Sequence, residues 1–391
     1  MDITNEEEIK IAEDFRRQLQ ERFPAYVGDE DMIKTAKSMD SNVAKLRSAL
    51  ASLGPNSENE RLDDILHELE DVSLPNPRDE PLTHTIIRSI CQEVETACRE
   101  AGVPLRGGVA YGASPTLEIN AEQHLVPTTG TSVVELSVGL INFCSHLSKV
   151  MSMSLIHDSS PEFMHVRSDS SEILKKIGQD RELKMLWLEL FGAYAYGDGP
   201  MNVRWQIVPH PQSLTRVLLL TAFERFAIAH EYGHHIEAHG EIESVGVGGD
   251  PGAHDKEIEA DIFAVALCRY MERRNKHPNI FLYSGAAPVL LLKCLDYVRR
   301  TRRIFASGED GPIGSTSTHP ETDERILAFD SYDNEFSPQQ RERFQQWRRD
   351  FCSIVDEVWN KLKPFYINMY KDGLRREERP ISWLPRSGDK R

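Results

Sequence analysis

The sequence has few cysteines and no spacing that would pair them. Six cysteines are scattered among 391 residues, without a CxxC pair. This pattern argues against a disulfide-framed domain. The N-terminal residues MDITNEEEIK are acidic and polar, so they do not resemble a secretory signal. We therefore expect reduced thiols and a cytoplasmic location.

Long hydrophobic runs and an excess of positive charge are also missing. The most apolar stretch, TSVVELSVGLINFCSHLSKVMSM, is interrupted by Glu135, His146 and Lys149. It falls short of the roughly 18 uninterrupted apolar residues of a membrane helix, so no membrane span is expected. The 46 Lys and Arg residues face 62 Asp and Glu residues, giving a net charge of −16. That balance argues against nucleic-acid binding through bulk positive charge.

Composition divides the chain into three parts. Residues 1–80 are acidic and predict short charged helices, either a solvated appendage or a regulatory or docking region. Residues 81–370 are expected to form the main domain, and the basic, proline-containing residues 371–391 a flexible tail. Within the main domain, alternating apolar positions after residue 105 predict a small β region, with residues 132–138 as the clearest strand. Helical periodicity dominates the remainder, so we predict an α+β fold that is mainly helical.

The segment AHEYGHH carries the chemistry. His230, Glu231 and His234 form an HExxH pattern inside an apolar helix predicted from residue 213 onward. Residues four apart share one helix face, so the two histidines can bind one metal ion while Glu231 stands beside it as a general base. Burial of these polar side chains is costly unless a metal or partner satisfies them. Gly233 costs a helix interior about 1 kcal/mol, which indicates close backbone packing at that point.

A catalytic zinc site needs a third protein ligand. A metzincin would have glycine and histidine where this chain has Glu237 and Gly240, so that class is excluded. The next predicted helix offers Glu257 as the third ligand and Asp261, on the same face, to orient a ligating imidazole. His254 and Asp255 are alternative ligands just before that helix. The expected cofactor is one Zn²⁺ per chain.

These blocks resemble the gluzincin metallopeptidases, and among them the family of CAAX prenyl endopeptidases and HtpX-type proteases. AHEYGHH and KEIEADIFA are similar to the two metal-binding helices of that family, and STHPETDERI is similar to its late THPxxxxRI element. The resemblance implies a gluzincin-like fold, with a small β-sheet over the metal-binding helix, and zinc-dependent hydrolysis of peptide bonds. A weaker likeness, in SVVELSVGLINF, implies that the strand residues Val133, Val134, Glu135 and Leu136 line the substrate cleft as its edge strand. Most members of the family are embedded in membranes, whereas a soluble form is expected here.

His319 has two interpretations. It could stabilise the oxyanion of the tetrahedral intermediate beside the zinc ion. Alternatively, the His-Pro pair begins a helix, with Pro320 in its first turn and Arg325 paired to a carboxylate.

The predicted function is a zinc endopeptidase that cleaves an intracellular protein or peptide, with Glu231 activating a zinc-bound water. One competing interpretation joins Glu231 and His234 with a second ExxH motif, Glu162 and His165, as a di-iron carboxylate oxidoreductase. Another is a zinc-containing sensor or binding protein without catalytic activity.

Overall fold

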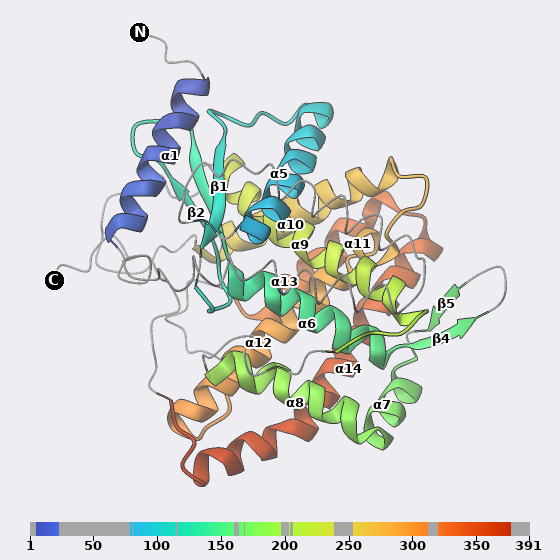
Figure 1. The fold of residues 1–391 in the computed structure, drawn as a ribbon. Coiled ribbons are helices and arrows are strands. Elements are labelled where there is room, and N and C mark those ends of the chain that lie inside the picture. Colours follow the sequence, from blue (N-terminus) through green and yellow to red (C-terminus); the bar gives the residue numbers. More distant parts are fainter. Residues whose placement is uncertain are drawn as a thin grey trace.

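The computed structural model describes residues 5–22, 79, 81–114, 116–159, 164–167, 169–196, 203, 206–237, 253–311 and 320–376. These residues form a mainly helical body with a small sheet at one side (Figure 1), in agreement with the predicted α+β class. In chain order the helices are α1 (Asn5–Arg22), α5 (Pro81–Ala101), α6 (Val138–Ser154), α7 (Ser170–Gln179), α8 (Arg181–Tyr196), α9 (Gln212–Ile236), α10 (Ala253–Arg273), α11 (Ile280–Tyr283), α12 (Ala286–Ser307), α13 (Thr322–Ser331), the 3₁₀ helix η2 (Tyr332–Glu335) and α14 (Pro338–Lys371). The strands are β1 (Val109–Ser114), β2 (Ala121–Leu125), β3 (Ser132–Ser137), β4 (Ile156–Ser159) and β5 (Met164–Arg167).

The sheet at the side of the helical body has the strand order β1-β3-β2. β3 pairs in parallel with β1 and antiparallel with β2. All six residues of β3 are buried, as expected for a strand with neighbours on both sides. The predicted edge strand Val133, Val134, Glu135 and Leu136 is therefore wrong, because these residues form the central strand. The edge strand that packs over α9 is the half-buried β2.

The two faces of the sheet bury different partners. Val134 and Leu136 point into the main hydrophobic core beside α5 and α9. Glu135 belongs to the opposite face and accepts a hydrogen bond of 2.6 Å from Nε of Arg16, which lies on α1. The same guanidinium forms an ion pair with the buried carboxylate of Asp79. The interpretation of residues 1–80 as a solvated appendage is thus wrong for α1, which packs on the sheet; residues 23–78 lie outside the described part of the chain.

The approach of α1 requires small residues on the sheet. A Cβ on Gly112 of β1 would collide with the guanidinium of Arg16. Ala12 of α1 packs with Ala110, Val126 and Val133 in a small separate apolar cluster. The sheet is therefore covered on both faces, by α1 on one side and by α5 and α9 on the other (Figure 1).

The helices of the main body agree with the predicted periodicity. α5 ends at Ala101 and is followed by Gly102, whose φ of 71° is a left-handed conformation that glycine adopts without steric cost. The helix predicted from residue 213 is α9, and α10 follows it as expected. Residues 206–210 precede α9 without forming a strand. Among the described residues, no helix has the length and apolar character that crossing a bilayer requires.

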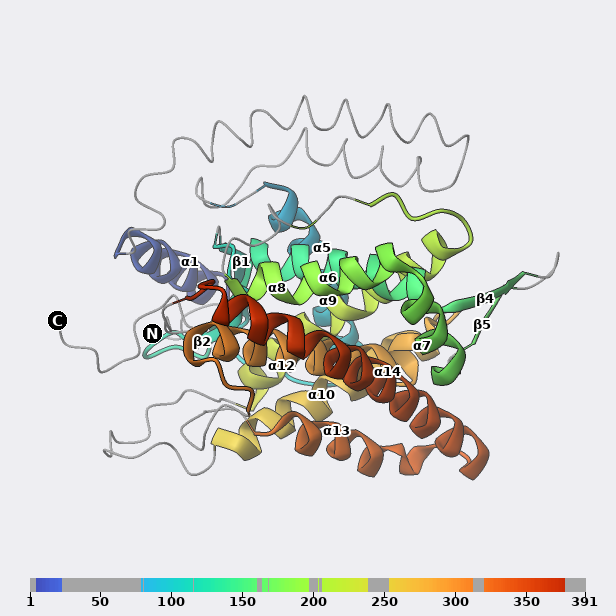
Figure 2. The same cartoon turned by 90° about the horizontal axis from the view of Figure 1, so that it is seen from below.

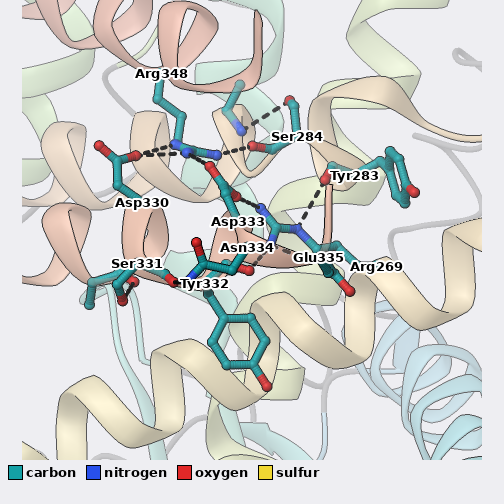
Figure 3. A network of polar contacts seen from close by, with 12 residues as sticks. Arg269, Tyr283, Ser284, Asp330, Ser331, Tyr332, Asp333, Asn334, Glu335 and Arg348 are labelled. Carbon is teal, nitrogen blue, oxygen red and sulfur yellow. Dashed lines mark hydrogen bonds and ion pairs between the residues drawn. The ribbon is translucent and has the colours of Figure 1, made fainter. Parts of the chain in front are cut away.

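A buried ion network joins α10, η2 and α14 (Figure 3). Arg269 of α10 donates to Oδ1 of Asp333 at 2.6 Å, and Arg348 of α14 binds the other oxygen of that carboxylate. Arg348 also donates to the backbone oxygen of Ser284 at 2.6 Å and to Asp330 at 2.7 Å. Arg269 and Asp333 are both 0% exposed, so each charge depends on the others for its solvation.

Candidate metal centre

Three donor groups converge between α9 and α10. The Nε2 atoms of His230 and His234 lie 3.1 Å apart. Each of them lies 3.5 Å from a carboxylate oxygen of Glu257. Tetrahedral zinc with ligand distances near 2.05 Å requires donor atoms about 3.3 Å apart. The facing donor atoms of His230, His234 and Glu257 thus have separations of 3.1–3.5 Å, close to those of a zinc tetrahedron, with each histidine facing a different oxygen of Glu257.

Helix geometry and one glycine place these donors. His230 and His234 are four residues apart on α9, so their imidazoles project from one face. Gly233 lies against α10, where an added Cβ would meet Cα of Ala260 at 2.8 Å and its carbonyl oxygen at 3.0 Å. The expectation of close backbone packing at Gly233 is confirmed. This close crossing brings Glu257 of α10 to the two histidines.

Asp261 and Arg325 hold His230 from behind. Nδ1 of His230 lies 3.0 Å from Oδ1 of Asp261. Arg325 of α13 grips the same carboxylate through Nε and Nη2, at 2.6 and 2.7 Å. A proton on Nδ1 directed at Asp261 leaves the lone pair of Nε2 facing Glu257 and His234. The predicted proximity of Asp261 to a ligating imidazole is confirmed, as is the pairing of Arg325 with a carboxylate.

The pKa values show that the centre carries surplus negative charge. Burial would lower the pKa of His230, but Asp261 and Glu257 outweigh it and raise that pKa to about 10. Burial raises the pKa of Glu231 to about 7, with a further contribution from Glu257. Three carboxylates, Glu231, Glu257 and Asp261, lie in the centre, and the guanidinium of Arg325 pairs with Asp261 at 2.6 and 2.7 Å. A divalent metal ion would offset this negative charge, so a donor set of two imidazoles and a carboxylate fits such an ion, Zn²⁺ among them.

Glu231 lies beside the three donors and is not one of them. The group that could hold a metal consists of His230, His234 and Glu257. Glu231 is 5% exposed and follows His230 directly on α9. Its carboxylate therefore occupies a water-poor position next to the donors, as the HExxH pattern predicts for a general base.

Two neighbours of the motif, whose roles the sequence did not reveal, fix α9 in place. The ring of His235 lies 2.8 Å from Oγ of Ser132 in β3 and 2.8 Å from the carbonyl oxygen of Leu105. Tyr232 donates a hydrogen bond of 2.9 Å to Glu95 of α5. These contacts orient the helix, so that the faces carrying Tyr232 and His235 meet α5 and the sheet while the third face presents the donors.

The remaining sequence candidates have different outcomes. His319 lies outside the described residues; α13 begins at Thr322, two positions after Pro320. His254 and Asp255 are exposed at the start of α10 and do not belong to the donor group. His165 belongs to strand β5, which contradicts a second ExxH motif on a bundle helix, and Glu162 lies outside the described part.

Comparison with known proteins adds no assignment. No family model matches the sequence, and neither a curated protein nor a solved structure matches the chain.

Proposed function

We propose that this protein is a zinc-dependent endopeptidase with a gluzincin-like fold. The observation that carries the proposal is the convergence of His230, His234 and Glu257, whose facing donor atoms are 3.1–3.5 Å apart, with a buried glutamate beside them. Structural zinc sites use four protein ligands, whereas catalytic sites use three and keep one position open. The described residues supply three ligands next to a candidate general base, an arrangement that favours hydrolysis over a purely structural metal.

The residues of the centre have three roles in the proposed reaction: metal binding, proton transfer and orientation of a ligand. His230, His234 and Glu257 would hold one Zn²⁺, which supplies Lewis acidity toward a carbonyl group and toward water. Glu231 takes a proton from the attacking water and passes it to the leaving amine. Asp261 and Arg325 keep the His230 ring in one tautomer and orientation, so its Nε2 remains available as a ligand.

The substrate is proposed to bind along β2. This strand pairs with β3 on one side, and it packs over α9. An extended peptide can add to such an edge through main-chain hydrogen bonds. Glu122 and His124 of β2, 3.1 Å apart, are near enough to Glu231 for their charges to influence its pKa. A peptide on β2 would therefore pass close to the base.

The decisive experiment compares wild type with Glu231→Gln. The variant should retain one zinc per chain by elemental analysis and lose about 10²–10⁴-fold in peptide cleavage, because the proton acceptor is gone. Glu237→Gln, an exposed glutamate at the end of α9, is the matched control and should cleave like wild type. Undiminished cleavage by Glu231→Gln would show that the mechanism is wrong.

Metal analysis also separates the competing functions. Two irons per chain would identify a di-iron carboxylate protein, although the position of His165 in a strand speaks against it. One zinc per chain without cleavage of proteome-derived peptides by wild type would identify a sensor or binding protein.

A further inference from the structure

A second group of polar side chains lies beside the metal centre, on α12. Arg299 and Arg302 are three residues apart and therefore neighbours on one face of this helix. α12 packs against α8, α9, α13 and α14, and its course beside α14 is visible in Figure 2. Both arginines are half-buried, so they lie at the margin of the packed side of the helix.

Arg302 has only part of its hydrogen-bonding capacity satisfied. Its Nη2 donates to the carbonyl oxygen of Tyr194 at 3.3 Å, at the end of α8. Its Nε is buried and has no hydrogen-bond partner in the described part of the chain. Arg376 adds a third guanidinium, which binds the carbonyl oxygen of Ala195 and lies 3.5 Å from Glu118. Burial and Arg376 lower the pKa of Arg302 to about 10, so its cationic form is poorly stabilised by its surroundings.

Arg299 connects this group to the metal centre. It is half-buried, and no described residue forms a hydrogen bond or an ion pair with it. Arg325 and Glu257 are close enough for their charges to act on it. Burial and Arg325 lower the pKa of Arg299, whereas Asp296 and Glu257 partly offset that effect. A guanidinium has five N–H donors, and a half-buried guanidinium whose donors lack protein acceptors destabilises the fold. A ligand that accepts these hydrogen bonds would recover this free energy on binding.

The local charge differs from that of the whole chain. The net charge is −16, yet three guanidinium groups lie together here, those of Arg299, Arg302 and Arg376. Glu118 acts on Arg302 and Arg376, whereas the carboxylates of Asp296 and Glu257 act on Arg299. Arginine binds carboxylates through two parallel hydrogen bonds, a geometry that lysine does not offer. An anionic group of a bound peptide is the partner that fits the donors, the charge and the place.

We propose that Arg299 and Arg302 form a carboxylate-binding subsite beside the metal centre, which selects peptides with an acidic side chain or a free C-terminal carboxylate. This subsite would define which peptides the protein accepts, and the inference rests on the proposed peptidase function. The two sources of the carboxylate share the same chemistry, and the experiment separates them.

The test measures peptide binding without turnover. Zinc-loaded Glu231→Gln protein is titrated against fluorescent hexapeptide pools, and binding is followed by anisotropy. The pools carry Glu or Gln at one fixed position, and each has either a free carboxylate or an amide at its C-terminus. We expect an advantage of about tenfold for one of the two carboxylates, since hydrogen bonds to charged groups are stronger than neutral ones. Adding Arg299→Gln should abolish that advantage.

Arg303→Gln is the matched control, because Arg303 lies on the same helix but packs against Gly311. This control should keep the full advantage, and Arg299→Lys should recover only part of it. Zinc content and circular dichroism show whether each variant folds. If Arg299→Gln does not fold, Arg302→Gln tests the same loss of the carboxylate advantage independently. Equal binding of all four pools, or no binding of any, would overturn the subsite. Cleavage by wild type with equal binding refutes the subsite alone, whereas selective binding without cleavage by wild type refutes only the peptidase.

Discussion

Replacing Gly233 with alanine tests whether the spacing of α9 and α10 sets the geometry of the metal centre. The added Cβ would lie 2.8 Å from Cα of Ala260, whereas carbon atoms pack at about 3.5 Å or more. Because the obstructing atoms belong to the backbone, the helices must separate by about 0.7 Å. Metal–ligand distances tolerate only about 0.2 Å. Glu257 on α10 would thus move out of range of His230 and His234 on α9.

The expected magnitudes differ for stability and for zinc binding. Alanine gains about 1 kcal/mol of helix propensity over glycine, and overpacking costs about 1–3 kcal/mol. The metal-free variant should therefore lose about 0–2 kcal/mol of unfolding free energy, measured by denaturant titration. Zinc affinity should fall at least about tenfold, measured by competition with a chromogenic chelator, because the third ligand is displaced.

Gly178→Ala is the control for the helix-propensity contribution. Gly178 lies in α7, and a Cβ there meets no atom within 4 Å. This variant should gain up to about 1 kcal/mol and leave zinc binding unchanged. If Gly233→Ala binds zinc as tightly as wild type, the close crossing does not determine the metal geometry and the reasoning fails.

Two further variants test the supports of the centre and of the sheet. Asp261→Asn removes the charge that orients His230 and should weaken zinc binding about 10–100-fold in the same chelator competition. An unchanged zinc affinity would show that Asp261 does not orient His230 for metal binding. Arg16→Met leaves Glu135 buried without its cation and Asp79 with only His84 as a partner, so denaturant titration should show a loss of about 3–5 kcal/mol. Burial already raises the pKa of Glu135 against the pull of Arg16, and a carboxylate with a raised pKa destabilises the fold above that pKa. The deficit of Arg16→Met should therefore shrink as the pH falls from about 8 to about 5; a deficit independent of pH would contradict this account.

The sequence predicted the donors because their geometry is local. His230 and His234 are brought together by helix periodicity alone, and Glu257 and Asp261 share a face of the next helix for the same reason. Gly233 was recognisable because glycine is unfavourable within a helix and so indicates a steric requirement. The sequence did not contain the distance between α9 and α10, which depends on the contact between Gly233 and Ala260.

Long-range pairing was beyond the reach of the sequence patterns. The segment SVVELS predicts a strand, but its central place depends on pairing with β1 and β2 on either side. The polar segment AEQHL of β2 gives a weak strand signal, so the edge of the sheet was assigned to the wrong residues. Arg16 likewise pairs with Glu135 across 119 positions, and its charged helix resembles a solvated one in composition. The buried guanidinium of Arg16 thus attaches α1 to the sheet, although the composition of α1 gives no sign of it.

The ion network around Asp333 has a consequence for how the molecule opens. Arg269 on α10 and Arg348 on α14 share one buried carboxylate on η2. If α14 detached alone, the buried carboxylate of Asp333 would lose one of its two guanidinium partners, at a cost of about 1.5–3 kcal/mol for a hydrogen bond between charged groups. Local opening of either helix is therefore suppressed, and the two separate only in a larger unfolding event. The helix that supplies Glu257 thus has the same cooperative stability as α14, although neither Arg348 nor Asp333 belongs to the metal-binding group.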